Sequence, residues 1–215
     1  MKKKSFAVLG LGKYGSSLAG GLFDLGMDVL VCDRNEDRVR DFENRSTVAV
    51  TCELADEEAL YSLGFENMDV VIVTTSTDLA ASILSVAVAK EKGVPLVIAK
   101  AATKHMGAIL KRVGADRIVE PETESGMRLA RVLASSGILD FFADDDNLCI
   151  VEMAPKETWI GKTLESLDLR RHLGANIIAV RTEKSKWAFP DSSAPLSADC
   201  RLLVAVERKT LPFLQ

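Results

Sequence analysis

The sequence predicts an α/β protein in which a Rossmann-like, doubly wound parallel sheet precedes a smaller α+β domain. Two observations predict the sheet. Six short apolar runs alternate with helical stretches up to about residue 136, and such alternation favours a parallel sheet with helices on both faces. The first run leads directly into Gly10-Leu-Gly12-Lys-Tyr-Gly15, a spacing typical of the turn between strand and helix in a nucleotide-binding βαβ unit.

The first βαβ unit spans residues 6–33. An apolar strand precedes the glycines, a helical run ends at Gly26, and a second apolar strand ends on Asp33. This acid is placed to accept hydrogen bonds from a ribose diol. Because Asp33 would repel a 2′-phosphate, adenosine phosphates or NAD fit better than NADP, although the neighbouring Arg34 weakens that preference.

Each glycine of the turn has its own physical role. Gly10 permits the tight turn, Gly12 lets the backbone approach a pyrophosphate, and Gly15 lets the helix pack closely on the strand. The helix that follows presents unpaired N–H groups and the positive end of its dipole to phosphates. The alternative is a structural turn on a Rossmann-like scaffold that holds no ligand.

The rest of the first domain continues the alternation of strands and helices. Asn35 and Asp78 are expected to cap helices, and Gly93 and Gly114 each follow a helix where a left-handed cap is needed. Ligands of such a sheet lie beyond the carboxyl ends of its strands. The further predicted strands are 47–51, 70–75, 93–99 and 114–119, and the further predicted helices are 35–44, 55–63, 79–92, 103–113 and 122–136.

The pattern changes near residue 140. Residues 138–142 are interpreted as a helix end and 144–146 as a polar joint, for which a solvated linker is favoured over a metal cage. The predicted domains are therefore 1–142 and 143–215. The second is small, so oligomerisation would help to stabilise it. Its predicted strand, helix and two further strands lie at residues 148–153, 164–172, 177–180 and 201–206.

The composition excludes several classes of protein. A net charge of −4 and a pI of about 5.4 give no reason to expect a nucleic-acid partner. No segment approaches the roughly 18 uninterrupted apolar residues of a membrane span, so a soluble, cytoplasmic protein is expected. The cysteines are scattered without a Cys-x-x-Cys pair, and small core residues are favoured over zinc ligands or disulfides.

No catalytic residues are predicted. Neither Tyr14 nor Tyr61 has a lysine four residues on, and neither His105 nor His172 has a carboxylate next to it in sequence. Gly-x-Ser-x-Gly and Walker-type turns are missing too. A nucleotide-binding domain without catalytic groups predicts a sensor, whose binding energy changes its conformation, and not an enzyme.

Further polar residues extend the candidate site. Residues 74–78, which include Thr75 and Ser76, follow a central strand, where their hydroxyls and backbone approach a ribose or phosphates; helix capping explains them equally well. Lys100 ends the next strand, where its charge is placed to meet a terminal phosphate. The alternative is an ordinary lysine whose apolar stem packs on the protein while its ammonium reaches solvent. Glu122 belongs to a carboxylate cluster that either holds a hard cation between subunits or favours the N-terminus of the next helix. From the residues alone the second is preferred.

These motifs together resemble the regulator of potassium conductance (RCK) family, specifically the soluble Ktr/Trk-type subunits of bacterial potassium uptake systems. The resemblance covers almost the whole chain. It implies an N-terminal Rossmann domain, a crossover helix and a C-terminal RCK domain, assembled as dimers into an octameric ring. It rests on residues 6–15, 33–36, 62–64 and 114–122 in the first domain and on 159–164, 167–170, 174–180 and 201–204 in the second.

The family resemblance also implies a function. Such rings dock on a separate membrane channel or transporter and gate potassium flux according to bound ATP, ADP or NAD(H), so the chain is expected on the inner face of the cell membrane. Lys13 stands where relatives often have arginine, which keeps a cation but loses its fork geometry. Many relatives have Gly-Asp-Ala-Thr where this chain has Cys52-Glu-Leu-Ala55, so only the acid, Glu53, is kept. The candidate nucleotide contacts are Gly10, Gly12, Lys13, Tyr14, Gly15, Asp33, Arg34, Asn35, Glu53, Thr75, Ser76 and Lys100.

Two more ligands are implied by the resemblance. Glu122 matches the glutamate that binds Ca²⁺ or Mg²⁺ at the dimer interface of Ktr-type relatives. The resemblance therefore favours a metal ligand at Glu122 more than the residues alone do. The C-terminal domain of several relatives binds c-di-AMP across its dimer interface; Arg170, Asn176 and Ile177 lie in the matching segments, with interface packing as the alternative.

The sequence therefore predicts a non-enzymatic, nucleotide-sensing gating subunit. Two other classes remain as alternatives. A small NAD-dependent oxidoreductase would need a residue poised for proton transfer, and an NADH-sensing transcriptional regulator would need a DNA-binding segment.

Overall fold

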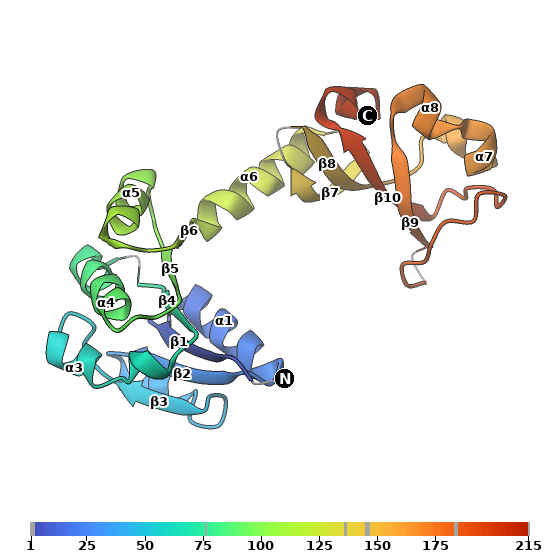
Figure 1. The fold of residues 1–215 in the computed structure, drawn as a ribbon. Coiled ribbons are helices and arrows are strands. Elements are labelled where there is room, and N and C mark those ends of the chain that lie inside the picture. Colours follow the sequence, from blue (N-terminus) through green and yellow to red (C-terminus); the bar gives the residue numbers. More distant parts are fainter. Residues whose placement is uncertain (1–2, 76, 136, 145–146, 183–184, 215) are drawn as a thin grey trace. The chain divides into compact units, whose positions relative to one another are not determined.

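The computed structural model describes residues 3–75, 77–135, 137–144, 147–182 and 185–214. Its contacts form two compact units, Met1–Glu122 and Thr123–Gln215, and each is described by itself (Figure 1). The boundary predicted after residue 142 falls inside strand β7 (Ile138–Asp144), which belongs to the sheet of the second unit.

The first unit contains a six-stranded parallel sheet in the order β3-β2-β1-β4-β5-β6. This order runs outward from β1 in both directions, so the chain reverses its winding between β1 and β4. The predicted doubly wound sheet is confirmed. Its strands are β1 Ser5–Leu9, β2 Asp28–Asp33, β3 Val48–Thr51, β4 Val70–Val73, β5 Leu96–Lys100 and β6 Arg117–Val119, and its helices are α1 Lys13–Asp24, α2 Glu36–Arg40, α3 Glu57–Tyr61, α4 Leu79–Glu91 and α5 Lys104–Val113, with a 3-10 turn η1 Phe65–Asn67.

Alternate residues of the central strands pack against helices on opposite faces of the sheet. In β1, Ala7 and Leu9 lie in the core that contains Val86 of α4, whereas Val8 packs with Ala19 of α1. All of these side chains are fully buried. Burial on both faces is the reason that the central strands are continuous apolar runs in the sequence.

The predicted helix caps are present. The Asn35 Oδ1 accepts a hydrogen bond from the Arg38 N–H at 3.1 Å, and the Asp78 Oδ1 accepts one from the Ala81 N–H at 2.9 Å. Helix α2 ends at Arg40 and is shorter than predicted. It ends early because the next turn is tighter than an α-helical turn: the Phe42 N–H donates to the Val39 carbonyl, three residues back, at 2.9 Å.

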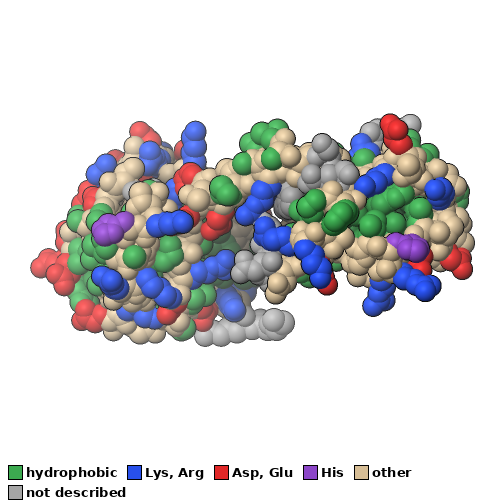
Figure 2. Space-filling view, turned by 90° about the horizontal axis from the view of Figure 1, so that it is seen from above, with side chains coloured by type: hydrophobic (Ala, Val, Ile, Leu, Met, Phe, Trp, Pro, Cys, Tyr) green, Lys and Arg blue, Asp and Glu red, His purple; other side chains and the backbone are tan. Residues whose placement is uncertain are grey.

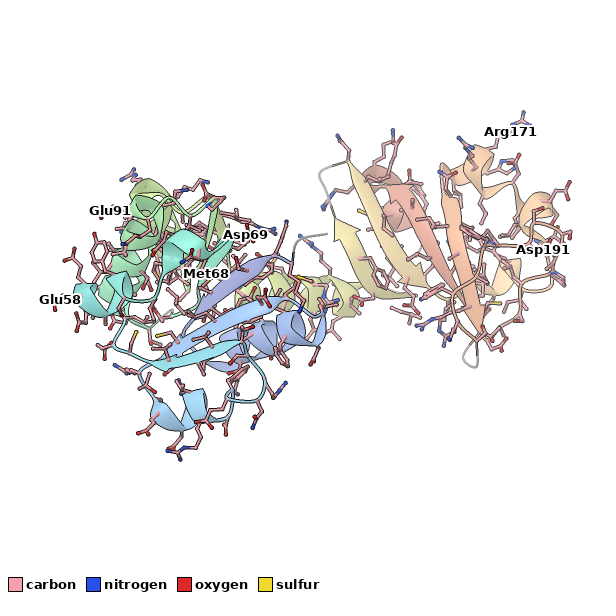
Figure 3. The ribbon with its side chains drawn as sticks, turned by 60° about the horizontal axis from the view of Figure 1, so that its bottom comes forward. Glu58, Met68, Asp69, Glu91, Arg171 and Asp191 are labelled. Carbon is pink, nitrogen blue, oxygen red and sulfur yellow. The ribbon has the colours of Figure 1, made fainter. Side chains whose placement is uncertain are left out.

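The amino ends of the strands are joined by side-chain hydrogen bonds. Asp69, labelled in Figure 3, precedes β4, and its Oδ2 accepts a hydrogen bond from the Ser5 N–H of β1 at 2.8 Å. The Ser5 hydroxyl donates to the Asn67 carbonyl at 2.8 Å. These bonds fix the edge of the sheet opposite to the carboxyl ends of the strands.

The second unit is built on a four-stranded antiparallel sheet in the order β7-β8-β10-β9. Leu202, Val204 and Val206 alternate along β10 and are fully buried in a core that also contains Val151 of β8. The predicted small α+β domain is therefore confirmed. Its elements besides β7 are α6 Pro121–Ala134, β8 Leu148–Met153, η2 Glu157–Trp159, α7 Leu164–Leu167, α8 Leu169–Leu173, β9 Asn176–Thr182, β10 Cys200–Glu207 and η3 Arg208–Phe213.

Two local predictions for this unit are wrong. Residues 138–142, interpreted as a helix end, lie in β7, where Ile138 pairs with Met153 and is buried. A short apolar run suits a helix or a strand, and pairing with β8 decides between them. The predicted helix 164–172 is two short helices, because Asp168 adopts a left-handed conformation with φ of 39°. Of the predicted joint at 144–146, residues 145–146 lie outside the described residues.

The surface carries charges of both signs. On the face shown in Figure 2, Lys and Arg side chains are interspersed with Asp and Glu, in keeping with the small net charge of −4. Within the described ranges, no helix is long and apolar enough to cross a membrane.

Candidate functional site

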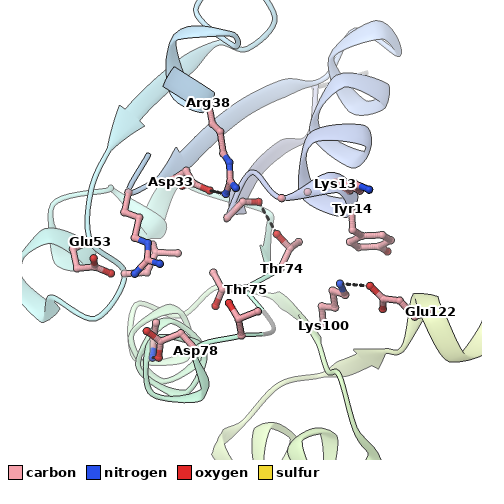
Figure 4. A pocket seen from close by; sticks show the side chains of 17 residues that line it. Lys13, Tyr14, Asp33, Arg38, Glu53, Thr74, Thr75, Asp78, Lys100 and Glu122 are labelled. Atoms are coloured by element: carbon pink, nitrogen blue, oxygen red, sulfur yellow. Dashed lines mark hydrogen bonds and ion pairs between the residues drawn. The ribbon is translucent and has the colours of Figure 1, made fainter. Parts of the chain in front are cut away.

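A cavity of about 300 Å³ lies at the carboxyl ends of the strands in the first unit. It opens where the winding of the sheet reverses between β1 and β4, the usual ligand position in such sheets. Figure 4 shows Glu53 on the β3 side and Lys100 with Glu122 on the β5 side. The cavity is lined by Gly10, Gly12, Lys13, Tyr14, Gly15, Asp33, Arg34, Arg38, Glu53, Leu54, Thr74, Thr75, Thr77, Asp78, Ala81, Lys100 and Glu122.

The glycine turn forms one wall of the cavity. Gly10 has a φ of +99°, which favours glycine, and its N–H donates to the Cys32 carbonyl at 2.7 Å. A Cβ on Gly15 would lie 2.0 Å from the Gly10 carbonyl oxygen, so no side chain fits there. At Gly12, by contrast, a Cβ would meet nothing within 4 Å. The backbone at Gly12 is therefore open to a ligand at the N-terminus of α1.

Thr74 joins the end of β4 to this turn. Its side chain is buried, and its hydroxyl donates to the Gly10 carbonyl oxygen at 2.6 Å and to the Leu9 carbonyl oxygen at 3.0 Å. Thr75 also lines the cavity, and its hydroxyl is hydrogen-bonded to the buried Ser82 hydroxyl at 2.9 Å. The threonines thus connect the turn, β4 and the start of α4. Ser76, the other predicted hydroxyl, lies outside the described residues.

Asp33 has a structural role in addition to facing the cavity. Its side chain is buried, its Oδ2 accepts a hydrogen bond from the Leu11 N–H at 2.6 Å, and its Oδ1 accepts one from the Asn35 N–H at 2.8 Å. The Arg38 guanidinium lies 3.5 Å from the same carboxylate. Asp33 therefore holds the glycine turn in place and carries a partly neutralised charge. Asn35 itself caps α2 and does not line the cavity.

Lys100 and Glu122 form an ion pair at the other end of the cavity. The Lys100 Nζ donates to the Glu122 Oε1 at 2.6 Å and lies 5.8 Å from the centre of the Tyr14 ring. The lysine side chain is 9% exposed and the glutamate side chain 69%. The hydrogen bond from Lys100 holds the pKa of Glu122 below its usual value. The cavity thus contains a buried cation whose single described carboxylate partner is exposed and able to move.

This ion pair gives a testable pH dependence. The folded-state pKa of Glu122 is lower than the ordinary value of 4.5, so its charge stabilises the fold above that pH and this contribution is lost as the pH falls through the folded-state pKa. In Glu122→Gln, an oxygen still accepts the lysine bond without the charge, and we expect a loss of about 0.2–1 kcal/mol at pH 6. Urea unfolding should show this loss shrinking below pH 4.5. A loss that is equal at all pH values, or matched by the exposed control Glu66→Gln, would contradict the assignment.

The structure brings most of the predicted nucleotide contacts together. Six other residues line the cavity. Thr74, Thr77 and Asp78 belong to the predicted segment 74–78, whereas Arg38, Leu54 and Ala81 belong to no predicted contact. Arg38 lies one turn into α2, where its distance from Asp33 depends on how the chain bends at Asn35. The predicted residues that line the cavity are Gly10, Gly12, Lys13, Tyr14, Gly15, Asp33, Arg34, Glu53, Thr75, Lys100 and Glu122.

The second unit contains a smaller cavity of about 180 Å³. It includes Arg170, Asn176 and Ile177, the three residues singled out in the C-terminal segment, together with Asp168 at the break between α7 and α8. Leu164, Leu169 and Ala175 complete its lining. No group of three or more His, Cys, Asp or Glu side chains that could hold a metal ion occurs within the part of the chain that the structure describes.

Comparison with known proteins assigns both halves of the chain. Residues 6–121 match the TrkA-N domain and residues 148–212 match the TrkA-C domain. The chain is 34% identical to Ktr system potassium uptake protein C of Bacillus subtilis over 202 residues, which cover 94% of this chain and 91% of that protein. It belongs to the TrkA/Ktr family of potassium uptake proteins.

Other members of the TrkA/Ktr family show similar agreement. Ktr system potassium uptake protein A of Vibrio alginolyticus is 32% identical over 94% of this chain and 91% of its own length. Ktr system potassium uptake protein A of Bacillus subtilis is 33% identical over 181 residues, which cover 84% of this chain and 82% of that protein.

Solved structures show that this TrkA/Ktr chain has the RCK fold. The GsuK RCK domain superposes with a TM-score of 0.69 at 20% identity over 99% of this chain, which spans about half (48%) of the GsuK chain. The TrkA-N domain of the inner membrane protein ybaL from Escherichia coli superposes with a TM-score of 0.55 at 24% identity, covering 62% of this chain and 98% of that one.

Proposed function

We propose that this protein is the nucleotide-sensing subunit of a potassium uptake system and regulates a separate membrane protein without catalysing a reaction. The observation that carries the proposal is the cavity at the N-terminus of α1, where Gly12 leaves the backbone open and Lys100 is a buried cation. The relatives named above, which match almost the whole chain, are potassium uptake proteins.

The cavity suits an adenosine nucleotide. Phosphates would lie against Gly12 and the first turn of α1, where helix N–H groups are unpaired. The ribose would meet Asp33, and the base would lie toward Glu53 and Leu54. ATP and ADP would share this crevice, but only ATP has a γ-phosphate to reach Lys100. NAD(H) is the second ligand class; GsuK, whose fold this chain shares, has been solved as a channel bound to NAD.

Two further ligands belong to the proposal. Glu122 would take part in a Ca²⁺ or Mg²⁺ site shared between subunits, and its exposure leaves it able to turn from Lys100 to an ion. Arg170, Asn176 and Ile177 would contact c-di-AMP in the second cavity, where the arginine supplies a charge for a phosphate.

The proposed assembly is a ring on the cytoplasmic side of the membrane. Dimers of the chain would associate into an octamer, with residues 1–142 as the nucleotide-binding part, α6 as the crossover helix and residues 143–215 as the C-terminal RCK domain. The shape of such a ring shifts the conformational equilibrium of the membrane protein. The coupling is reciprocal, so binding to the membrane protein changes nucleotide affinity by the same factor.

The experiment is a flux measurement in proteoliposomes that contain a Ktr-type potassium-translocating membrane protein. With this chain added, ATP and ADP are expected to give different potassium fluxes, because the γ-phosphate engages Lys100. In Lys100→Met the difference should be lost, whereas the exposed control Lys104→Met should retain it. Equal fluxes with ATP and ADP would refute the proposal.

A further inference from the structure

Two cysteine thiols meet beside the nucleotide cavity. Cys32 lies in β2 and pairs with Val50 of β3. Cys52 lies two residues beyond Val50, and side chains two residues apart in an extended chain return to the same face. Cys52 therefore faces Cys32, and the two Sγ atoms are 2.8 Å apart. Both are free thiols.

The two thiols differ in access and in acidity. Cys32 is fully buried, whereas Cys52 is half-buried and reachable from solvent. The hydrogen bond from the Cys32 thiol lowers the pKa of Cys52, although Glu53 and Asp56 oppose this effect. The same contact and burial raise the pKa of Cys32. Cys52 is thus the thiol that ionises and meets an external reagent first, and Cys32 is placed to react second.

Both cysteines are connected directly to residues that line the cavity. Cys32 precedes Asp33, and Cys52 precedes Glu53 and Leu54. The Cys52 N–H donates to the Asp33 carbonyl at 3.2 Å. A change in the separation of the two sulfurs is therefore transmitted to the ribose and base ends of the candidate site.

We propose that Cys32 and Cys52 form a redox-active dithiol, which a low-molecular-weight disulfide oxidises to an intramolecular disulfide that weakens nucleotide binding. The Cys52 thiolate attacks one sulfur of the oxidant RSSR, forming a mixed disulfide and releasing RS⁻. The Cys32 thiol then gives up its proton, its sulfur attacks Cys52 Sγ, and the second RS⁻ leaves. Two protein thiols and RSSR thereby yield one protein disulfide and two RSH.

The bond draws the ends of β2 and β3 together, since covalently linked sulfurs lie closer than thiols in contact. Asp33 and Glu53 move with their neighbours, so ATP affinity falls severalfold in the oxidised protein. This part of the inference rests on the nucleotide-binding function proposed above.

The test uses the reduced protein, with all 215 residues, and glutathione disulfide. After incubation and acid quenching, free thiols are alkylated with N-ethylmaleimide and the peptides are analysed by mass spectrometry. We expect Cys32 and Cys52 to be joined while Cys149 and Cys200 remain alkylated. In Cys32→Ala, glutathione should stay attached to Cys52, because no second thiol displaces it. The control Cys200→Ser should behave like the unmodified protein.

The outcomes separate the two proposals. Alkylation of Cys32 and Cys52 to the same extent as Cys149 would overturn the dithiol. A disulfide that leaves calorimetric ATP affinity unchanged would overturn its effect on the site. If the reduced protein does not bind ATP, the proposed function fails, whereas the dithiol is still supported or overturned by the mass spectra alone.

Discussion

Replacing Gly15 by alanine is expected to destabilise the first unit by roughly 1–3 kcal/mol, the usual cost of overpacking a close-packed site. The added Cβ would lie 2.0 Å from the Gly10 carbonyl oxygen and 2.6 Å from the Thr74 Oγ1. Neither neighbour yields easily, because Gly10 is backbone and the Thr74 hydroxyl is bonded to it. Urea unfolding followed by far-UV circular dichroism measures the loss.

Gly21→Ala is the matched control for this experiment. Gly21 lies in the same helix, and a Cβ there would meet nothing within 4 Å. Alanine should therefore stabilise α1 by up to about 1 kcal/mol, because it is the better helix former. If the two variants were equally stable, the close approach of α1 to the glycine turn would be refuted.

The second large effect is expected from Asp33→Asn. The carboxylate accepts hydrogen bonds from the N–H groups of Leu11 and Asn35, one on each oxygen. An amide keeps only one acceptor, so one buried N–H loses its partner, at a cost of about 1–3 kcal/mol. The same change removes a charged acceptor from the proposed ribose contact. ATP affinity should fall roughly ten- to a hundredfold, as expected for loss of a hydrogen bond to a charged group.

Calorimetry with ATP and urea unfolding together measure these two effects. Asp28→Asn provides the control, because Asp28 begins the same strand. Its carboxylate is half-exposed and makes a long ion pair with the Lys3 ammonium, at 3.9 Å. That variant should bind ATP and unfold like the unmodified protein. Unchanged ATP affinity in Asp33→Asn would remove Asp33 from the binding site, whatever its effect on stability.

The first unit could be predicted from sequence because its signals are local. Continuous apolar runs such as residues 70–73 identify strands that are buried on both faces, and the spacing of Gly10, Gly12 and Gly15 identifies the turn. Asp33 could be placed at the site because a strand ends on it. Chain order and strand direction then bring the predicted contacts to one edge of the sheet.

The remaining features depend on packing between distant segments. The contact of Cys32 with Cys52 follows from the register of β2 against β3, which scattered cysteines do not reveal. The hydrogen bond from the Leu11 N–H to Asp33 depends on how closely the turn approaches β2. Strand β7 cannot be recognised from its own residues, because its short apolar run becomes a strand only through pairing with β8.

The central claim is that the cavity at the N-terminus of α1 binds an adenosine nucleotide. Calorimetric titration of the reduced protein with ATP, repeated on Gly12→Ala, tests it most directly. Gly12 has a φ of −68°, which alanine adopts, and its Cβ would point into open space, so the variant should fold normally. We expect saturable ATP binding, displaced by ADP, that is lost in Gly12→Ala. Absence of ATP binding, or equal binding by the folded variant, would contradict the claim.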